Sequence, residues 1–334
     1  MINEAYEDLT NLSLLDFDKK SVLIIGAGYI AKEYAIALSK LKIKDVTILG
    51  KSKKNLQKFK QFSNFKIIDG GYEDVISEIP KKDLVIIALP ILKLIPVAKK
   101  IIKYGHGKIL IEKPGSIFKK DLMDLEKLVK KENVSIAYNR FFYPAFHKLK
   151  LLTKNEGGIT SCKFDFTEWL HTIEIKKYDK QITKRWGISN SLHVISMAIG
   201  LIGTPKKISA YQFGNIEWHH AGSVFVGSGL TKKNIPFSYH ANWGGGGRWG
   251  IEVITKKNIY RLNPLEKLFV SKKGSSEWKE IPLKKSYSGV KEGIVEEVAV
   301  MLNDKLNKKI GVINLKDAME FNTIAEKIFG YKNK

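Results

Sequence analysis

The hydrophobic pattern divides the chain into two parts with different periodicities. In the first part, continuous apolar runs alternate with segments whose apolar residues recur every three or four positions, as in helices. The apolar runs predict strands at 21–25, 46–49, 65–68, 84–89, 108–111 and 134–138, and the intervening segments predict helices such as 29–41 and 119–132. Because continuous apolar strands are typical of sheets covered on both faces, this part is predicted to be a doubly wound parallel sheet.

From about residue 160 the pattern changes to alternating apolar and polar positions separated by short turns. It predicts strands at 160–168, 207–213, 223–229, 235–243, 249–255 and 257–262, with helices at 189–202, 288–304 and 315–329. This is typical of an α+β domain with a large, mostly antiparallel open sheet and helices on one side. We therefore predict an α/β protein of two domains, 1–135 and 136–334. Four consecutive glycines, 244–247, predict either a lid or a wide hairpin.

The charge balance changes this picture little. The chain has 57 Lys and Arg residues against 34 Asp and Glu, a formal net charge of +23. The lysines are spread over nearly every segment, and no basic stripe with interleaved aromatic residues appears, so we expect no nucleic-acid partner. The positive field would instead attract anionic ligands. Arginine occurs only at 140, 185, 248 and 261, so each is a candidate for a position that needs the planar guanidinium.

Other features exclude further classes of protein. The single cysteine, Cys162, cannot form an internal disulfide, which is typical of a reducing compartment. The N-terminal residues lack the basic and apolar regions of a signal peptide, and the longest apolar run, 84–92, is too short to span a bilayer. We expect a cytoplasmic protein with no membrane partner. His219 and His220 are too isolated from acidic and Cys residues to suggest a metal ion, so we expect no metal site.

A glycine-rich turn follows the first strand, in the stretch SVLIIGAGYIAKEYAIAL. Gly26 allows a tight turn, Gly28 lets the backbone approach a pyrophosphate, and Ala31 lets the helix pack closely on the sheet. Tyr29 and Ile30 lie in the first helical turn, where free N–H groups attract phosphates. The alternative is an ordinary strand-to-helix turn, but the position after the first strand favours a Rossmann dinucleotide-binding loop.

The end of the second strand indicates which dinucleotide would bind. NAD sites usually have Asp or Glu there, whereas this chain has Gly50, Lys51, Ser52 and Lys53. Because a small residue followed by Ser and Lys accommodates a 2′-phosphate, we predict a preference for NADP(H), with NAD(H) as the other option. The alternative is that these lysines belong to the general surface charge.

Several motifs occur in a fixed order along the chain. After the glycine loop come ALP at 88–90, EKP at 112–114, AYNRFFYPA at 137–145 and NSLHVISMAIGLIGTP at 190–205. This ordered set resembles the Gfo/Idh/MocA oxidoreductases, the glucose–fructose oxidoreductase and inositol dehydrogenase family. The resemblance implies an N-terminal Rossmann domain and a C-terminal domain whose open sheet lines the substrate site and serves in oligomer contacts. It also implies hydride exchange between a nicotinamide and a carbinol carbon of a sugar or polyol.

Carried over by position, the resemblance implies that Lys113 contacts substrate and helps a proton to move, and that His193 is the general acid or base. The alternative for His193 is a buried structural histidine. Ser189 and Ser196 stand where many family members have Asp, so Asn190 is expected to hydrogen-bond in place of a carboxylate. Further predicted cofactor contacts are Ala88, Leu89, Glu112 and Asn139.

Aromatic faces beside Arg and polar groups suit sugar rings and their anionic substituents. The predicted substrate contacts are Arg140, Tyr143, Trp169, Arg185, Trp186, Asn190 and Arg248. For the tryptophans, the alternative is a place in the core or in a subunit interface. We therefore predict an NADP(H)-dependent oxidoreductase acting on a secondary alcohol or ketone of a sugar, with an anionic or nucleotide-linked sugar as one candidate, assembled as a homodimer or homotetramer. The alternatives are a catalytically weak dinucleotide-binding regulator and a reductase of a non-sugar carbonyl or imine.

Overall fold

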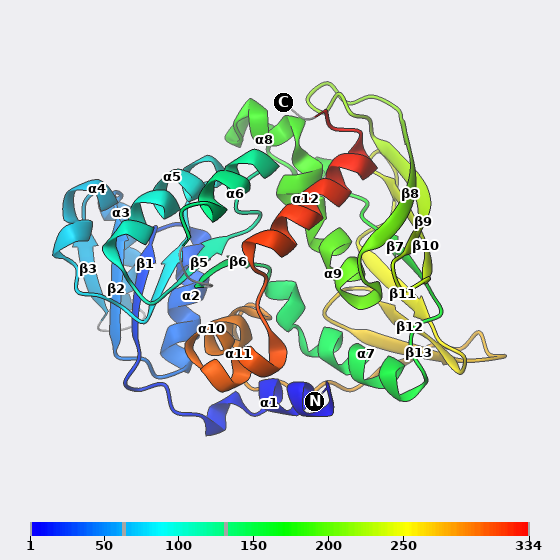
Figure 1. The fold of residues 1–334 in the computed structure, drawn as a ribbon, viewed down its shortest axis with the longest axis horizontal. Helices are drawn as coiled ribbons and strands as arrows, with labels where there is room; N and C mark the ends of the chain where they lie inside the picture. Colours follow the sequence, from blue (N-terminus) through cyan, green and yellow to red (C-terminus); the bar gives the residue numbers. More distant parts are fainter. Residues whose placement is uncertain (1, 62–64, 130–132, 333–334) are drawn as a thin grey trace. The chain divides into compact units, whose positions relative to one another are not determined.

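The computed structural model describes residues 2–61, 65–129 and 133–332. The chain forms two compact units, both drawn in Figure 1. The first unit contains Asn3–Phe142 and Lys285–Met319. The second contains Tyr143–Lys284 and the residues from Glu320 onward. Among the described residues, no helix combines the length and the apolar character needed to cross a membrane.

The first unit contains a six-stranded parallel sheet in the order β3-β2-β1-β4-β5-β6. The strands are β1 (Ser21–Ile25), β2 (Asp45–Gly50), β3 (Lys66–Asp69), β4 (Leu84–Ile87), β5 (Lys108–Glu112) and β6 (Val134–Ala137). This order is that of the dinucleotide-binding fold, in which ligands lie at the carboxyl ends of the strands where the order reverses, between β1 and β4. The predicted doubly wound parallel sheet is confirmed.

Helices cover both faces of this sheet. The helices of the chain up to residue 142 are α1 (Ile2–Thr10), α2 (Tyr29–Lys40), α3 (Lys53–Gln57), α4 (Tyr72–Val75), α5 (Ile91–Ile101) and α6 (Lys119–Glu126), with 3-10 turns at Leu12–Leu14, Lys58–Gln61, Ile76–Glu78, Ile102–Tyr104 and Asn139–Phe142. α2 packs on β1, whereas α5 packs on β4 and β5, and Figure 1 shows these two helices on opposite faces. Because β1 and β4 are covered on both faces, their residues Val22–Ile24 and Leu84–Ile87 are buried.

The C-terminal segment adds α10 (Ile294–Leu302), α11 (Asp304–Ile310) and α12 (Leu315–Phe329). α10 packs against α2 and contributes Val295, Val298 and Ala299 to the core of the first unit. The helix predicted at 288–304 corresponds to the shorter α10 alone, and a second helix, α11, follows it because Asn303 caps α11 by accepting from the Leu306 amide. The boundary between the units falls inside α12.

The second unit contains an eight-stranded sheet in the order β14-β13-β12-β11-β7-β10-β9-β8. Its strands are β7 (Ser161–Asp165), β8 (Pro205–Phe213), β9 (Val224–Thr231), β10 (Pro236–Asn242), β11 (Gly250–Ile254), β12 (Asn258–Leu262), β13 (Leu268–Lys272) and β14 (Lys279–Ile281). β10 and β7 pair in parallel, and the other pairs are antiparallel. The predicted mostly antiparallel sheet is confirmed, with two further strands, β13 and β14, that the sequence pattern did not indicate.

One face of this sheet is apolar and the other is polar. The helical elements are α7 (Pro144–Asn155), α8 (Lys180–Lys184), a π-helical turn η8 (Gly187–Ser191) and α9 (Leu192–Ile202), with 3-10 turns at Leu170–Thr172 and Ile175–Lys177. α9 packs against β7 and β11, where Phe164 and Ile251 are buried neighbours. On the other face, Glu252 forms ion pairs with Lys163 and Arg261.

The four-glycine segment 244–247 connects β10 to β11. These two strands are not neighbours, because β7 lies between them in the sheet. The hairpin interpretation of this segment is therefore wrong. The connection instead crosses one end of β7, and the residues after it, Arg248 and Trp249, enter β11 from there.

Candidate functional site

The glycine loop joins β1 to α2 at the carboxyl end of the parallel sheet. Gly26 has a φ of 131°, and a Cβ at this position would collide with the carbonyl oxygen of Ala88. Gly28 is the N-cap of α2 and makes no side-chain cap. A Cβ at Gly28 would meet no atom of the described residues within 4 Å beyond its chain neighbours. Gly26 is thus required by the turn, whereas Gly28 leaves open space beside a helix N-terminus, as a bound pyrophosphate requires.

The end of β2 has no room for an acidic side chain. A Cβ at Gly50 would lie 2.8 Å from the Cβ of Ala27 in the glycine loop. After it, Lys51, Ser52 and Lys53 are exposed, and Ser52 caps α3 by accepting from the Asn55 amide at 3.3 Å. The Lys53 ammonium lies 3.5 Å from the Asp69 carboxylate, so one acid does approach this corner.

A cation that the sequence did not indicate lies at the start of α2. Lys291 comes from the segment before α10, and its ammonium is 5.2 Å from the centre of the Tyr29 ring. The Tyr29 side chain is 70% exposed, whereas Ile30 packs against the core. Burial lowers the pKa of Lys291, and the carboxylates of Glu112 and Glu33 oppose that shift. No local pattern could have revealed this contact, because it is formed only by the fold.

A second group of polar residues lies at the end of β5. Tyr34 donates its hydroxyl hydrogen bond to Glu112 Oε1 at 2.7 Å. Burial raises the pKa of Glu112, although this hydrogen bond and the charges of Lys113 and Lys291 lower it. The charge of Glu112 acts with burial to raise the pKa of Glu297 in α10 well above its usual value. Lys113 therefore follows directly on a buried carboxyl group whose pKa is raised.

Three further predicted cofactor residues lie around this edge of the sheet. Ala88 follows β4 and donates its amide to the Ile25 carbonyl at 2.9 Å, so that it borders the glycine loop, and the partly buried Leu89 comes next. Asn139 donates its side-chain amide to the Glu292 carbonyl at 2.9 Å, which fixes the segment that carries Lys291. The charge of Arg140, the next residue, also lowers the pKa of Lys291.

In the second unit, His193 is the second residue of α9. Its ring is buried, with its centre 5.9 Å from that of Trp249. Ser189 and Ser196 donate their hydroxyls to backbone carbonyls, those of Trp186 and His193. These two serines therefore stabilise the helical turns around the histidine.

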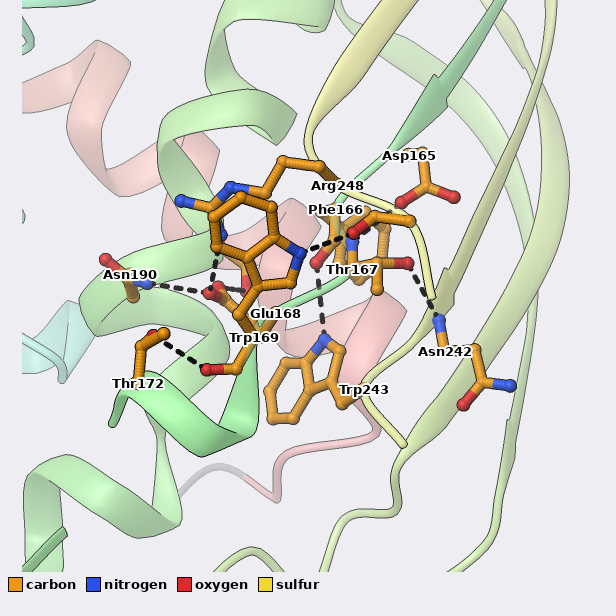
Figure 2. Close-up of polar contacts among 12 residues, drawn as sticks. Asp165, Phe166, Thr167, Glu168, Trp169, Thr172, Asn190, Asn242, Trp243 and Arg248 are labelled. Carbon is orange, nitrogen blue, oxygen red and sulfur yellow. Dashed lines mark hydrogen bonds and ion pairs between the residues drawn. The ribbon is translucent and has the colours of Figure 1, made fainter. Parts of the chain in front are cut away.

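A buried carboxylate from another segment contacts the turn that leads into α9. Glu168, three residues after β7, is 2% exposed. It accepts from the hydroxyl of Ser191 at 2.5 Å and from the side-chain amide of Asn190 at 2.9 Å. Figure 2 shows Asn190 directed at this carboxylate. Spacing could not reveal the contact, since the two segments are more than twenty residues apart.

Arg248 lies between two tryptophan rings next to this carboxylate. Its guanidinium carbon is 4.4 Å from the centre of Trp169 and 4.5 Å from that of Trp249. One of its nitrogens is 3.9 Å from Glu168. Trp169 is held by a hydrogen bond from its indole nitrogen to the Gly247 carbonyl at 2.7 Å (Figure 2). Trp169, Asn190 and Arg248, three of the predicted substrate residues, are thus brought together around Glu168.

The other predicted substrate residues of this unit lie in its packed interior. Arg185 pairs with Glu326 at 2.5 Å and stacks on Tyr331. Trp186 is buried against Tyr178 and Trp218. Tyr143 is buried, and its hydroxyl reaches Glu266 at 3.3 Å. These contacts tie elements of the second unit together. Within residues 2–61, 65–129 and 133–332, no group of three or more His, Cys, Asp or Glu side chains could hold a metal ion.

Comparison with known proteins identifies the class of this protein. The profile of a family described as an oxidoreductase family with an NAD-binding Rossmann fold matches residues 20–140. Residues 20–140 therefore belong to the Gfo/Idh/MocA oxidoreductases, as the ordered motifs predict, and the chain is an NAD(P)-dependent oxidoreductase. None of the curated proteins compared with the chain matches it.

Solved structures share the fold over nearly the whole chain. UDP-N-acetylglucosamine 3-dehydrogenase GnnA from Acidithiobacillus ferrooxidans is 12% identical, with a TM-score of 0.71 over 92% of this chain and 96% of its own. Levoglucosan dehydrogenase in complex with NADH is 16% identical, with a TM-score of 0.72 over 92% and 95%. The dehydrogenase MviM from Clostridium difficile is 18% identical, with a TM-score of 0.73 over 94% and 100%. At these identities the likeness shows the fold.

Proposed function

We propose that the chain is an NADP(H)-dependent oxidoreductase that transfers a hydride between the nicotinamide and a secondary alcohol or ketone of a sugar or sugar derivative. The observation that carries the proposal is the open space at Gly28, beside the N-terminus of α2 and at the carboxyl end of the parallel sheet. The nicotinamide, when bound, supplies or accepts the hydride.

The cofactor would be held by the glycine loop and by cations around it. Gly26 forms the turn, Gly28 would admit the pyrophosphate, and Lys291 adds a positive charge beside Tyr29 at the same helix end. A preference for NADP(H) is supported by Gly50, where packing against Ala27 leaves no room for the acid that binds ribose hydroxyls. Ser52 and the ammonium groups of Lys51 and Lys53 would meet the 2′-phosphate.

Two groups would handle the proton that leaves or joins the reacting oxygen. Lys113 would contact the substrate, and Glu112 with its Tyr34 hydrogen bond would set the local charge. His193 would accept the hydroxyl proton during oxidation and return it during reduction. Imidazole suits this task near neutral pH, and positioned proton transfer of this kind typically contributes about 10²–10⁴ in rate.

The residues around Glu168 would bind the sugar. Trp169 offers a partly exposed aromatic ring, Asn190 an amide, and Arg248 a planar donor for a carboxylate or phosphate. Two structural neighbours are named as dehydrogenases of sugar compounds, one of them nucleotide-linked. These names suggest UDP-N-acetylglucosamine and levoglucosan as first probes, with D-glucuronate as a simpler anion.

The test is to mix the protein with NADP⁺ or NAD⁺ and each of the three probes, and to follow absorbance at the reduced-nicotinamide band. The proposal predicts reduction of NADP⁺ by at least one probe, abolished in Lys113→Ala. Tight cofactor binding without turnover on any sugar would contradict it and favour the regulator. A response to imines or non-sugar ketones alone would favour the other alternative.

We also infer a homo-oligomer that associates through the polar face of the second unit's sheet. This face bears the Lys163–Glu252–Arg261 ion pairs and a hollow of about 330 Å³ lined by Ser238, His240 and neighbouring residues. Light scattering after gel filtration should give the mass of a dimer or tetramer. A mass near 37.8 kDa, that of one chain, would contradict this inference.

A further inference from the structure

The second unit contains a buried carboxylate that contacts three residues of the proposed substrate region or next to it. Glu168 is 2% exposed and accepts from Ser191 at 2.5 Å and from Asn190 at 2.9 Å. Arg248 faces it at 3.9 Å. A buried carboxylate is costly unless its oxygens are hydrogen-bonded or paired, so these contacts hold their partners in place as much as they stabilise the carboxylate.

Two of these partners lie in an unusual turn. Asn190 and Ser191 belong to the π-helical turn η8 (Gly187–Ser191), which leads directly into α9 and His193. π-helical turns are rare and occur frequently at functional sites. Glu168 accepts from two consecutive side chains of this turn, those of Asn190 and Ser191. It therefore fixes the backbone just before α9, two residues ahead of His193.

The third partner of Glu168, Arg248, is linked to His193 through Trp249. Arg248 is flanked by Trp169 and Trp249, and the ring of Trp249 is 5.9 Å from that of His193. The Arg248 side chain is 38% exposed, so part of it is accessible to solvent. His193, Trp249, Arg248 and Trp169 therefore form a row of neighbouring side chains. Glu168 contacts this region in two ways, through the η8 residues before His193 and through Arg248.

We propose that Glu168 is a positioning residue, which holds η8 and Arg248 in one arrangement so that His193 and the guanidinium act on the same anionic sugar. This inference rests on the proposed function for its catalytic consequence. Glu168 does not itself touch the substrate. It orients the two groups that do, the His193 ring and the Arg248 guanidinium. Because one carboxylate holds both, replacing Glu168 should disturb both.

The chain offers a matched control for this proposal. Glu252 is also buried, and it too holds an arginine, since Arg261 Nε donates to Glu252 Oε2 at 3.0 Å while Arg261 stacks on Trp278. Glu168→Gln and Glu252→Gln therefore remove the same charge from similar surroundings. Glu252 lies outside the proposed catalytic and substrate-binding groups but on the face proposed for oligomer contacts, so light scattering must first show that Glu168→Gln and Glu252→Gln have the same mass as the wild-type protein. A loss caused only by weakened packing should appear equally in both variants.

Arginine side-chain NMR tests the positioning directly and without turnover. The chain has four arginines, so the Nε–H region of a ¹⁵N spectrum contains four signals, assigned by single Arg→Lys replacements. Glu168→Gln should move or broaden the Arg248 signal and leave that of Arg261 in place, and Glu252→Gln should do the reverse. An Arg248 signal unchanged in Glu168→Gln would overturn the proposal. If Glu168→Gln does not fold, Glu168→Asp takes its place in this comparison, because it keeps the charge but withdraws the carboxylate from its partners.

Kinetics with UDP-N-acetylglucosamine and D-glucuronate test the consequence. Misplacing a reacting group by about 1 Å can cost on the order of 10²-fold, so Glu168→Gln should lower kcat by about 10- to 100-fold, with the Kd for NADPH unchanged and the unfolding midpoint no lower than in Glu252→Gln. An unchanged kcat, or losses that match those of Glu252→Gln, would overturn the positioning role. A wild-type protein inactive on every probe would overturn the proposed function instead, and the Arg248 signal would still decide whether Glu168 positions the guanidinium.

Discussion

The ammonium of Lys291 lies 5.2 Å from the centre of the Tyr29 ring, at the N-terminus of the helix that follows the glycine loop. The two residues are far apart in sequence, and α10, which follows Lys291, packs against α2. The fold thus brings a cation to the helix end at which a dinucleotide pyrophosphate would lie, where it adds to the field of the helix dipole.

Replacing this cation should weaken cofactor binding. Lys291→Gln is expected to raise the Kd for NADPH by about 5- to 10-fold, which corresponds to roughly 1 kcal/mol at 1.4 kcal/mol per tenfold change. Lys291→Arg should stay within about twofold of wild type, because it keeps the charge. Isothermal titration calorimetry at low and high salt measures both variants. Equal affinities for wild type and Lys291→Gln would show that Lys291 does not face the phosphates.

Charge reversal at the end of β2 should change cofactor selectivity. Lys51→Asp combined with Lys53→Asp places two acids where the 2′-phosphate of NADPH is proposed to lie, and NADH lacks that group. The Kd for NADPH should therefore rise about 10-fold or more, while the Kd for NADH changes little. Lys19→Asp combined with Lys66→Asp makes the same change of net charge at exposed positions near the amino ends of β1 and β3. Equal losses for NADPH and NADH would refute the preference for NADP(H).

The stability of the first unit should fall as pH rises through the weakly acidic range. Glu296 in α10 is 4% exposed, and burial, with the nearby charge of Glu292, raises its pKa from 4.5 to about 7. An acid whose pKa is raised by folding stabilises the fold at pH values below its unfolded pKa, and that contribution is lost as pH rises to the folded pKa. The loss between about pH 4.5 and 7 would reach roughly 3 kcal/mol at 1.36 kcal/mol per pKa unit.

Urea unfolding at several pH values measures this effect. Glu296→Gln should flatten the decline between pH 5 and 8 and should be more stable than wild type at pH 8. Glu78→Gln, at an exposed position, serves as the control and should follow the wild-type curve. A Glu296→Gln curve parallel to that of wild type would show that the carboxyl group ionises in the folded protein at its ordinary pH.

Much of the fold could be predicted from the sequence because burial imposes simple patterns. SVLII and LVII are continuous apolar runs since the strands they form, β1 and β4, are covered on both faces. The edge strand β14 (Lys279–Ile281) escaped prediction because two of its three residues are charged and exposed. The order of the strands around β7 is not encoded in the local sequence pattern. The pattern therefore allows a hairpin at the glycine segment 244–247, which the structure excludes.

The candidate site was predictable only where it is local in sequence. Gly26 and Gly28 follow directly from the turn they form, and the ordered motifs indicate Lys113 and His193. Glu168 and Lys291 act through contacts with distant segments, which no spacing rule encodes. The sequence shows that position 50 carries no acid. The close contact with Ala27, which leaves no room for an acidic side chain there, is visible only in the structure.

The central claim is that the protein moves a hydride between a sugar carbon and NADP(H), with Lys113 and His193 assisting the proton. His193→Asn should lower kcat by about 10²- to 10⁴-fold, because it removes a positioned acid or base, and should leave the Kd for NADPH within a few-fold of wild type. Lys113→Ala should show a similar loss. Loss of cofactor affinity equal to the loss of rate would instead assign these residues to cofactor binding.

The most direct measurement uses UDP-N-acetylglucosamine or D-glucuronate deuterated at its carbinol carbons, mixed with NADP⁺ and the protein. Mass spectrometry of the nicotinamide product then shows whether the carbon-bound deuterium has moved. The account predicts singly deuterated NADPH from the wild-type protein and little or none from His193→Asn in the same time. NADPH without deuterium, or bound NADP⁺ that is never reduced by either sugar, would contradict it.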